Sequence, residues 1–596
     1  MEFMNQRLVR VALGQEPADL IIRGGKLINV YTRRVSPADV AIADGRIAAV
    51  GDVAYCEGDQ TEIVDAAGKL LAPGLVDAHI HPDVSKLTIT RMANALVPRG
   101  VTSIMCPLDQ VGVVAGIDGM RFVLDEAKRT PLKLWHSSPS RLPYTTPAST
   151  IGYRFGPAEH AVAQKWPEAV GIWEYMSDSI LDFDQPVYQV AEMALQNRLS
   201  LNGHAPVIMG RSLAACAAAG MRNDHESYTA EELAEKLANG VWALIRRGTH
   251  SDNVPECVRA ITELGLDTRH MALCTDDSDC LDISEQGGVD FIARYVIRLG
   301  VDPVSAIQMG SLNAAECYKV DMLVGSITPG RIADVLLLGD LPSLRVDAVI
   351  ANGKLVARDG QMLEPVASPQ YPPSFHNTMR LDRPVIAEQL YLRVDPRAES
   401  ADVLCIHVDL DEGLLSRRRD AIVAVRDGKI QPDPDQDVLY ISVTDRYTGR
   451  GMTGLGLISG FGLKHGAIAT SLSPDDCNII CVGASVDDMA VAINHLVQLG
   501  GGQAVVDGGR VTAELPLPLC GIIADVSVEE MAAMESKLNA AACALGSRLR
   551  RPFFFLIFLS ITAIPEYAMT DRGLVEHASR SVISPVTGVR LAQERQ

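Results

Sequence analysis

The chain has 596 residues, more than a single hydrophobic core usually supports, so we expect two to four domains. Hydrophobic residues make up 47% of the sequence and charged residues 21%, which is typical of a globular protein. A formal net charge of −20 argues against the basic surface that nucleic-acid binding requires, so we expect no nucleic-acid partner.

Cysteine usage, the N-terminal stretch and one apolar run indicate the compartment of the protein. The twelve cysteines are scattered and form no Cys-x-x-Cys pair, and the stretch Met1–Arg7 lacks the apolar core of a secretory leader. We therefore expect reduced thiols and a cytoplasmic protein. The most apolar run, residues 553–564, is too short to span a bilayer, and we expect a buried strand there and no membrane role.

The first segment of the chain reads as short strands separated by turns. Residues 19–72 contain an Asp44-Gly45 pair between apolar alternations, a strong hairpin signal. A very similar pattern returns at residues 330–356, with an Asn352-Gly353 turn. We predict one small β-sandwich composed of residues 1–72 and 325–365, with a large insertion between them.

The insertion, residues 73–324, alternates strand-like runs with helical patterns. Eight such runs predict a (β/α)₈ barrel, in which the chemistry lies at the C-terminal ends of the strands. The runs end near His81, Cys106, Ser137, Glu174, His204, His225, Arg246 and Asp276.

The composition changes after the second part of the sandwich. Residues 366–383 form a proline-rich linker. Residues 384–596 then mix strand-like and helical patterns, and we predict a separate C-terminal α/β (α+β) domain.

The end of the first barrel strand carries His79 and His81, separated by one residue. Residues i and i+2 of a strand point to the same face, so both imidazoles would converge on one point and suit a first-row metal. Two ordinary polar residues at a strand end are the competing interpretation. The preceding Pro73-Gly74 turn and further ligand candidates downstream favour the metal.

Four more candidates end later strands. Glu174 could bridge two metals, although a lone glutamate at a strand end is usually solvated. His204 and His225 would singly be structural, but both follow apolar runs at the expected interval. Asp276 can contact a metal and accept a proton from water, with a helix N-cap as the alternative. Six candidates exceed the needs of one metal and favour two.

These motifs resemble a known superfamily. Pro73–His81, Thr275-Asp276 and residues 325–335 are similar to the amidohydrolase superfamily. Within it, the chain resembles the bacterial adenine deaminases at residues 203–206, 225–227, 274–277, 466–471, 515–518 and 564–574. The resemblance implies a binuclear site at His79, His81, Glu174, His204, His225 and Asp276, holding two divalent metal ions, manganese or iron. It also implies a small purine substrate, and we expect a homodimer.

The chain departs from the pattern of this family at substrate-facing positions. Asp83 stands in the place of a glutamate, and Asp109 ends a motif that usually carries histidine and glutamate. In the C-terminal domain, Pro474-Asp-Asp-Cys477 replaces a histidine-rich motif. Asp83 and Asp109 remain candidates for the acid that protonates a ring nitrogen, against the alternative of ordinary loop carboxylates.

The preferred hypothesis is hydrolysis of adenine to hypoxanthine and ammonia, with Asp276 carrying the proton to the departing nitrogen. A second hypothesis keeps the metal-dependent hydrolase but assigns another aminated heterocycle or a cyclic amide. A third is a non-catalytic paralogue that binds a purine or a partner; six ligand candidates argue against it.

Overall fold

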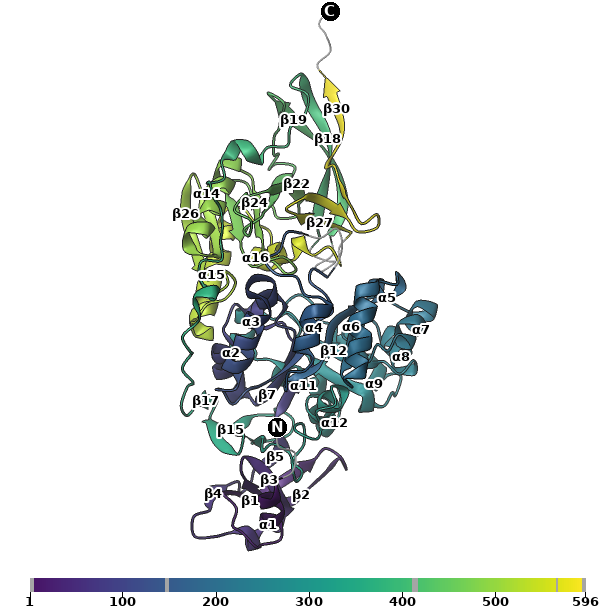
Figure 1. Cartoon of the computed structure of the whole chain (residues 1–596), viewed down its shortest axis with the longest axis vertical. Helices are drawn as coiled ribbons and strands as arrows, with labels where there is room; N and C mark the ends of the chain where they lie inside the picture. The colour runs from purple at the N-terminus through teal and green to yellow at the C-terminus, as the bar shows by residue number, and fades with distance from the viewer. Residues whose placement is uncertain (1–4, 145–148, 410–415, 564–565, 592–596) are drawn as a thin grey trace, which may run out of the picture.

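The computed structural model describes residues 5–144, 149–409, 416–563 and 566–591. It stacks three parts along its long axis: a strand-rich end, a central barrel and a C-terminal region (Figure 1). Residues 1–4 of the leader prediction and Ile564-Pro565 of the C-terminal motif lie outside the described residues. Across the described ranges, no helix combines the length and the apolar character needed to cross a membrane.

The strand-rich end is one nine-stranded sheet built from two distant segments. β5 pairs with β14 in antiparallel register, Pro73 opposite Val335, and so joins the segments before and after the barrel. Asp44-Gly45 and Asn352-Gly353 adopt the positive φ angles that their hairpin turns require. The strands are β1 (Leu20–Asn29), β2 (Arg34–Ala43), β3 (Arg46–Gly51), β4 (Glu62–Asp65), β5 (Leu70–Pro73), β14 (Val335–Leu338), β15 (Val346–Ala351), β16 (Lys354–Arg358) and β17 (Gln361–Met362).

The central part confirms the predicted (β/α)₈ barrel. Eight strands pair in parallel in sequence order. They are β6 (Leu75–Asp77), β7 (Val101–Cys106), β8 (Lys133–Pro139), β9 (Ala169–Met176), β10 (Ser200–His204), β11 (Asn223–Asp224), β12 (Trp242–Arg246) and β13 (Met271–Cys274). The first strand ends earlier than the sequence suggested, so the His79–His81 segment follows β6 rather than belonging to it.

Backbone hydrogen bonds between the first and last strands close the barrel. Ala78 N donates to Leu273 O at 3.1 Å, Asp276 N to His79 O at 2.7 Å, and His81 N to Asp276 O at 3.3 Å. Asp77 strengthens this seam, because its carboxylate accepts hydrogen bonds from the backbone N–H and the hydroxyl of Thr275. The seam therefore includes residues predicted to bind metal.

Helices cover the outside of the barrel and begin at the signals expected for them. Thr229, for example, caps α8 by accepting from Glu232 N, and Pro303 occupies the first turn of α12. The helices between β6 and β14 are α2 (Ile89–Leu96), α3 (Asp109–Ala127), α4 (Pro157–Ala163), α5 (Ser177–Leu181), α6 (Gln185–Gln196), α7 (Gly210–Ala218), α8 (Ala230–Ala238), α9 (Val254–Thr262), α10 (Cys280–Glu285), α11 (Val289–Arg298), α12 (Pro303–Met309) and α13 (Leu312–Cys317).

The described residues of the C-terminal region form a ten-stranded mixed sheet, a three-stranded sheet and three helices, as the α/β prediction requires. Its strands are β18 (Ala398–Val408), β19 (Ser416–Arg426), β20 (Lys429–Ile430), β21 (Leu439–Thr444), β22 (Thr453–Ser459), β23 (Ala467–Thr470), β24 (Ile479–Gly483), β25 (Gly502–Asp507), β26 (Arg510–Pro516), β27 (Tyr567–Thr570), β28 (Gly573–Glu576), β29 (Ser581–Ile583) and β30 (Val586–Leu591). The helices are α14 (Val486–Leu499), α15 (Val528–Ala544) and α16 (Pro552–Ile557).

Most of the apolar run at 553–564 is helical, over residues 553–560, so the prediction of a buried strand was wrong; Ile564 lies outside the described residues. It forms α16, continued by a 3₁₀ turn over Phe558–Ser560. A continuous apolar run fits a buried strand and a buried helix equally well, and Pro552 in the first helical turn favours the helix.

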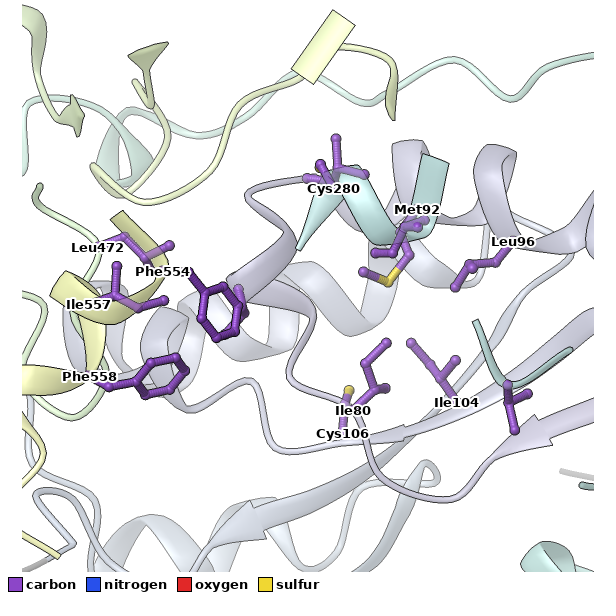
Figure 2. Packing of buried hydrophobic residues seen from close by; sticks show 14 of the residues in the cluster. Ile80, Met92, Leu96, Ile104, Cys106, Cys280, Leu472, Phe554, Ile557 and Phe558 are labelled. Atoms are coloured by element: carbon purple, nitrogen blue, oxygen red, sulfur yellow. The ribbon is translucent and has the colours of Figure 1, made fainter. Parts of the chain in front are cut away.

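This helix packs the C-terminal region against the barrel. Phe554 and Phe558 belong to one hydrophobic cluster with Ile80 and Ile104 of the barrel, and Figure 2 shows the two groups facing each other. Ion pairs join the same two parts: Lys86 Nζ lies 3.2 Å from Glu535 Oε1, and Arg551 binds Asp279. The C-terminal region therefore rests on the end of the barrel where the predicted site residues lie.

Candidate metal centre and active site

The six predicted ligands converge at the C-terminal ends of the barrel strands. On one side, His79 Nε2 lies 3.5 Å from Glu174 Oε1 and 3.4 Å from Asp276 Oδ1. His81 Nε2 lies 3.6 Å from each of the same two oxygens. The two imidazoles after β6 therefore share both carboxylates.

Glu174 also reaches the histidines on the other side. Its Oε2 lies 2.7 Å from His204 Nδ1, and its Oε1 lies 3.9 Å from His225 Nε2. Four groups of donor atoms fall within 4.8 Å of one another: His79–His225–Asp276, His79–His81–Glu174, Glu174–His204–His225 and His81–Asp276–Asp277. Glu174 belongs to two of these groups, one with each pair of histidines, which is the position a bridging carboxylate needs.

The backbone turns two of these carboxylates toward the centre. The register between β9 and β10 shifts after Ile172 opposite Leu201, so an extra residue in β9 changes the direction of Glu174. Glu174 and Asp276 both have positive φ angles, 48° and 59°. Such strained conformations at non-glycine residues are concentrated at functional sites.

Several buried nitrogen and oxygen atoms that could bind a metal have no hydrogen-bond partner among the described residues. They are both ring nitrogens of His79 and of His204, Nδ1 of His225 and Oε2 of Glu174. His204 Nδ1 and Glu174 Oε2 are 2.7 Å apart, yet their geometry is not that of a hydrogen bond. Buried polar atoms normally find partners, and imidazole and carboxylate donors aimed at common points fit divalent metal ions.

An arginine controls the charge of Asp276. Arg246 Nη1 lies 2.8 Å from Asp276 Oδ2, and the same guanidinium binds Glu226 through both of its terminal nitrogens. Burial alone would raise the pKa of Asp276, but Arg246 and the neighbouring histidines hold it below its usual value. Asp276 is therefore ionised at neutral pH and can accept a proton.

A cavity of about 340 Å³ opens beside these residues, within the size range of small-molecule sites. Asp109 lines it, with Oδ2 3.7 Å from His81 Nδ1 and 3.2 Å from the Tyr144 hydroxyl, which donates to it. Asp83 is buried in a 3₁₀ turn behind this wall and is not among the lining residues. Burial and the nearby Asp109 raise the pKa of Asp83 to about 7.

Several residues at the site were not singled out from the sequence. Arg246 was noted only as a strand end, although an arginine at the mouth of a barrel is itself a signal. Glu226 directly follows His225, and Asp277 directly follows Asp276. Asp475, within the stretch 474–477 noted above as a departure from the family pattern, and Phe558 come from the C-terminal region and line the same cavity.

Comparison with known proteins matches both halves of the chain to family models. Residues 70–356 match the amidohydrolase family, and residues 414–581 match the adenine deaminase C-terminal domain. Adenine deaminase 4 of Rhizobium meliloti is 43% identical over 98% of this chain and 97% of its own length. Adenine deaminase 1 of Desulfotalea psychrophila is 40% identical over 98% of both chains.

The chain is also similar to solved structures. A β-aspartyl dipeptidase from Fervidobacterium islandicum AW-1 is 17% identical, with a TM-score of 0.44, and covers 58% of this chain and 98% of its own.

Proposed function

This chain belongs to the adenine deaminase family of the amidohydrolases, and we propose that it hydrolyses adenine to hypoxanthine and ammonia. The observation that carries the proposal is the convergence of six imidazole and carboxylate donors beside a cavity of small-molecule size. The names of relatives that span nearly the whole chain support adenine as the substrate.

The donor set supports two divalent metal ions, manganese or iron. His79, His81, Glu174, His204, His225 and Asp276 would hold them, with Glu174 shared between the two ions. Bound metals supply a site of this kind with water acidic enough to react as hydroxide at neutral pH.

The residues of the chain then handle the protons. Asp276, kept ionised by Arg246, takes a proton from the attacking water and passes it to the exocyclic nitrogen. Addition of water at C6 gives a tetrahedral carbon, which loses the exocyclic nitrogen only after that nitrogen is protonated, so the leaving group is ammonia. The second proton of the water passes from the C6 oxygen to Asp109 and restores the acid that protonates N1, which leaves the C6 carbonyl of hypoxanthine.

Of two neighbouring buried acids, one faces the ring nitrogens in this proposal. Asp109 lines the cavity and is the better placed to donate a proton to N1 as negative charge develops there. Asp83 lies behind it, and its raised pKa keeps a proton close to Asp109. We propose Asp109 as the acid that contacts the substrate and Asp83 as its partner.

Ammonia release from a panel of aminopurines, measured with manganese-loaded protein, tests the function. We expect adenine to give the highest kcat/KM. Faster turnover of another aminated heterocycle would favour the second hypothesis, which the shortened acids Asp83 and Asp109 support.

The setting of the enzyme is also part of the proposal. Eleven of the twelve cysteines are buried and free, which supports a reducing compartment such as the cytoplasm. A homodimer is proposed, and light scattering of the purified protein would test it.

A further inference from the structure

We propose that the C-terminal region supplies a purine-binding residue, Asp475, whose carboxylate accepts a hydrogen bond from the imidazole-ring N–H of the substrate. The inference rests on the proposed function and deepens it. It assigns recognition of the substrate to a second part of the molecule, whereas all the proposed metal ligands come from the barrel.

Asp475 lies where a substrate would meet it. It lines the same cavity as His81, Glu174 and Asp276, although it lies 201 residues after the end of the last barrel strand at Cys274. Its neighbours in the cavity wall include Phe558 and Ile561, also from the C-terminal region. These side chains provide an apolar surface for the flat face of a base, and Asp475 adds a polar group beside it.

The carboxyl group of Asp475 has an unfilled hydrogen-bonding position. The residue is only 6% exposed, and its Oδ1 has no partner among the described residues. Burial and the neighbouring Asp476 raise the pKa of this carboxyl group to about 7, and the nearby backbone of Tyr144 offsets part of that rise. A buried acceptor that lacks a partner among the described residues, on a side chain that lines a cavity, is suited to bind a donor on the ligand.

The backbone at this position is strained. Asp475 has a φ of 153° and Cys477 a φ of 53°, both rare for residues with side chains. The adjacent Asp476 has an evident structural role, because its Oδ1 accepts hydrogen bonds from the Ser473 hydroxyl and from Asn478 N. No side-chain hydrogen bond holds Asp475 within the turn among the described residues, and the residue lines the cavity, so we attribute a functional role to this conformation.

A chain of contacts orders the cavity wall from the metal centre outward. His81 is next to Asp109, Asp109 accepts from the Tyr144 hydroxyl, and the Tyr144 backbone reaches Asp475. If C6 of the base lies at the metal centre, Asp109 meets the pyrimidine ring and Asp475 meets the part farther away. The imidazole ring of adenine carries its one ring N–H there, and a carboxylate is its natural acceptor.

The test compares Asp475→Ala and Asp475→Asn with the matched variant Asp476→Asn in the same turn. Kinetics with adenine and with 9-methyladenine, which lacks the N9–H donor, are measured with metal-replete protein; a poorly turned-over ligand is assayed as a competitive inhibitor. Thermal unfolding and metal content are recorded for every variant.

We expect Asp475→Ala to lower kcat/KM for adenine by about 10- to 100-fold, chiefly through KM, because the lost contact is far from the reacting carbon. Asp475→Asn keeps an oxygen acceptor and should lose less. The 9-methyladenine constants should change by less than about threefold, since that ligand never made the bond. Asp476→Asn should resemble the wild type.

Three results would overturn the inference: unchanged adenine kinetics in Asp475→Ala, equal losses for both ligands, or an equal loss in Asp476→Asn. A wild-type protein that does not deaminate adenine would instead refute the proposed function, so the two failures are distinguishable.

Discussion

The two ends of the cavity are built in different ways. At the metal end, every candidate ligand comes from a barrel strand end, and the donors lie within a few ångströms of one another. At the opposite end, Asp475, Phe558 and Ile561 come from the C-terminal region and reach the cavity only because two parts of the chain pack together. The comparison suggests that the barrel carries the hydrolytic chemistry and the packed-on region adjusts what the site accepts.

Asp276→Asn should have the largest effect at the metal end. The proton acceptor is lost while an amide oxygen remains to contact a metal, so we expect kcat to fall by about 1,000-fold with most of the metal retained. Ammonia release and elemental analysis measure the two effects. Asp267→Asn, an exposed aspartate just before the same strand, is the control. A near wild-type rate would mean that another group accepts the proton.

Glu174→Gln tests whether one carboxylate serves both sides of the metal end. We expect manganese-loaded wild-type protein to hold about two metals per chain and the variant to approach about one, because an amide is a poor bridge. Elemental analysis after gel filtration measures this, with Glu168→Gln, just before the same strand, as the control. A wild-type content fixed at one metal would contradict the bridging role.

Arg246→Lys should have a smaller effect on the same chemistry. Lysine keeps the charge but cannot bind Asp276 and Glu226 at once, so the carboxylate loses its fixed orientation. We expect kcat to fall by about 10- to 100-fold with metal content unchanged. Arg247→Lys, at the next position, should stay close to the wild type; equal losses in both would point to a general disturbance of β12.

Lengthening Asp109, which lines the cavity beside His81, or Asp83 behind it should change adenine turnover less. We expect Asp109→Glu and Asp83→Glu to leave adenine turnover unchanged or lower it by up to about tenfold, because the cavity is fitted to the shorter side chains. Steady-state kinetics with adenine and other aminopurines measures this. A large gain in adenine turnover would mean that the present site prefers another base.

The smallest effect concerns an ion pair that joins the C-terminal region to the barrel. His577 Nε2 lies 3.3 Å from Asp178 Oδ2, and this hydrogen bond raises the pKa of His577. A raised folded-state pKa contributes stability below the unfolded value of about 6.5, and the contribution is lost as the pH rises through the folded pKa. His577→Ala should therefore lower Tm by up to about 2 °C more near pH 6 than near pH 9, where only the Nδ1 hydrogen bond to the Thr562 carbonyl is lost. Equal Tm shifts at the two pH values would mean that the positive charge of His577 does not contribute to stability.

The metal end was predictable from sequence because its signals are local. His79, Glu174, His204 and Asp276 each end an apolar run, and the barrel rule brings such ends together. Their convergence was foreseen, while their role as ligands stays a prediction. The opposite end depends on tertiary packing: Asp475 follows no strand-end rule, and the run containing Phe558 fits a strand as well as the helix that forms. Arg246 was visible as a strand end, but its pairing with Asp276 required the structure.

Closure of the barrel is coupled to metal binding at the seam between the first and last strands. The backbone hydrogen bonds that join the first and last strands involve His79, His81 and Asp276. The residues that close the barrel are therefore the same ones that are proposed to hold the metals. Metals bound there would hold the first and last strands together and would stabilise the closed barrel by mass action. Removal of the metals by a chelator should therefore destabilise the junction between the first and last strands first. Amide hydrogen exchange should become faster at Ala78, His81 and Asp276 before it becomes faster in the outer helices.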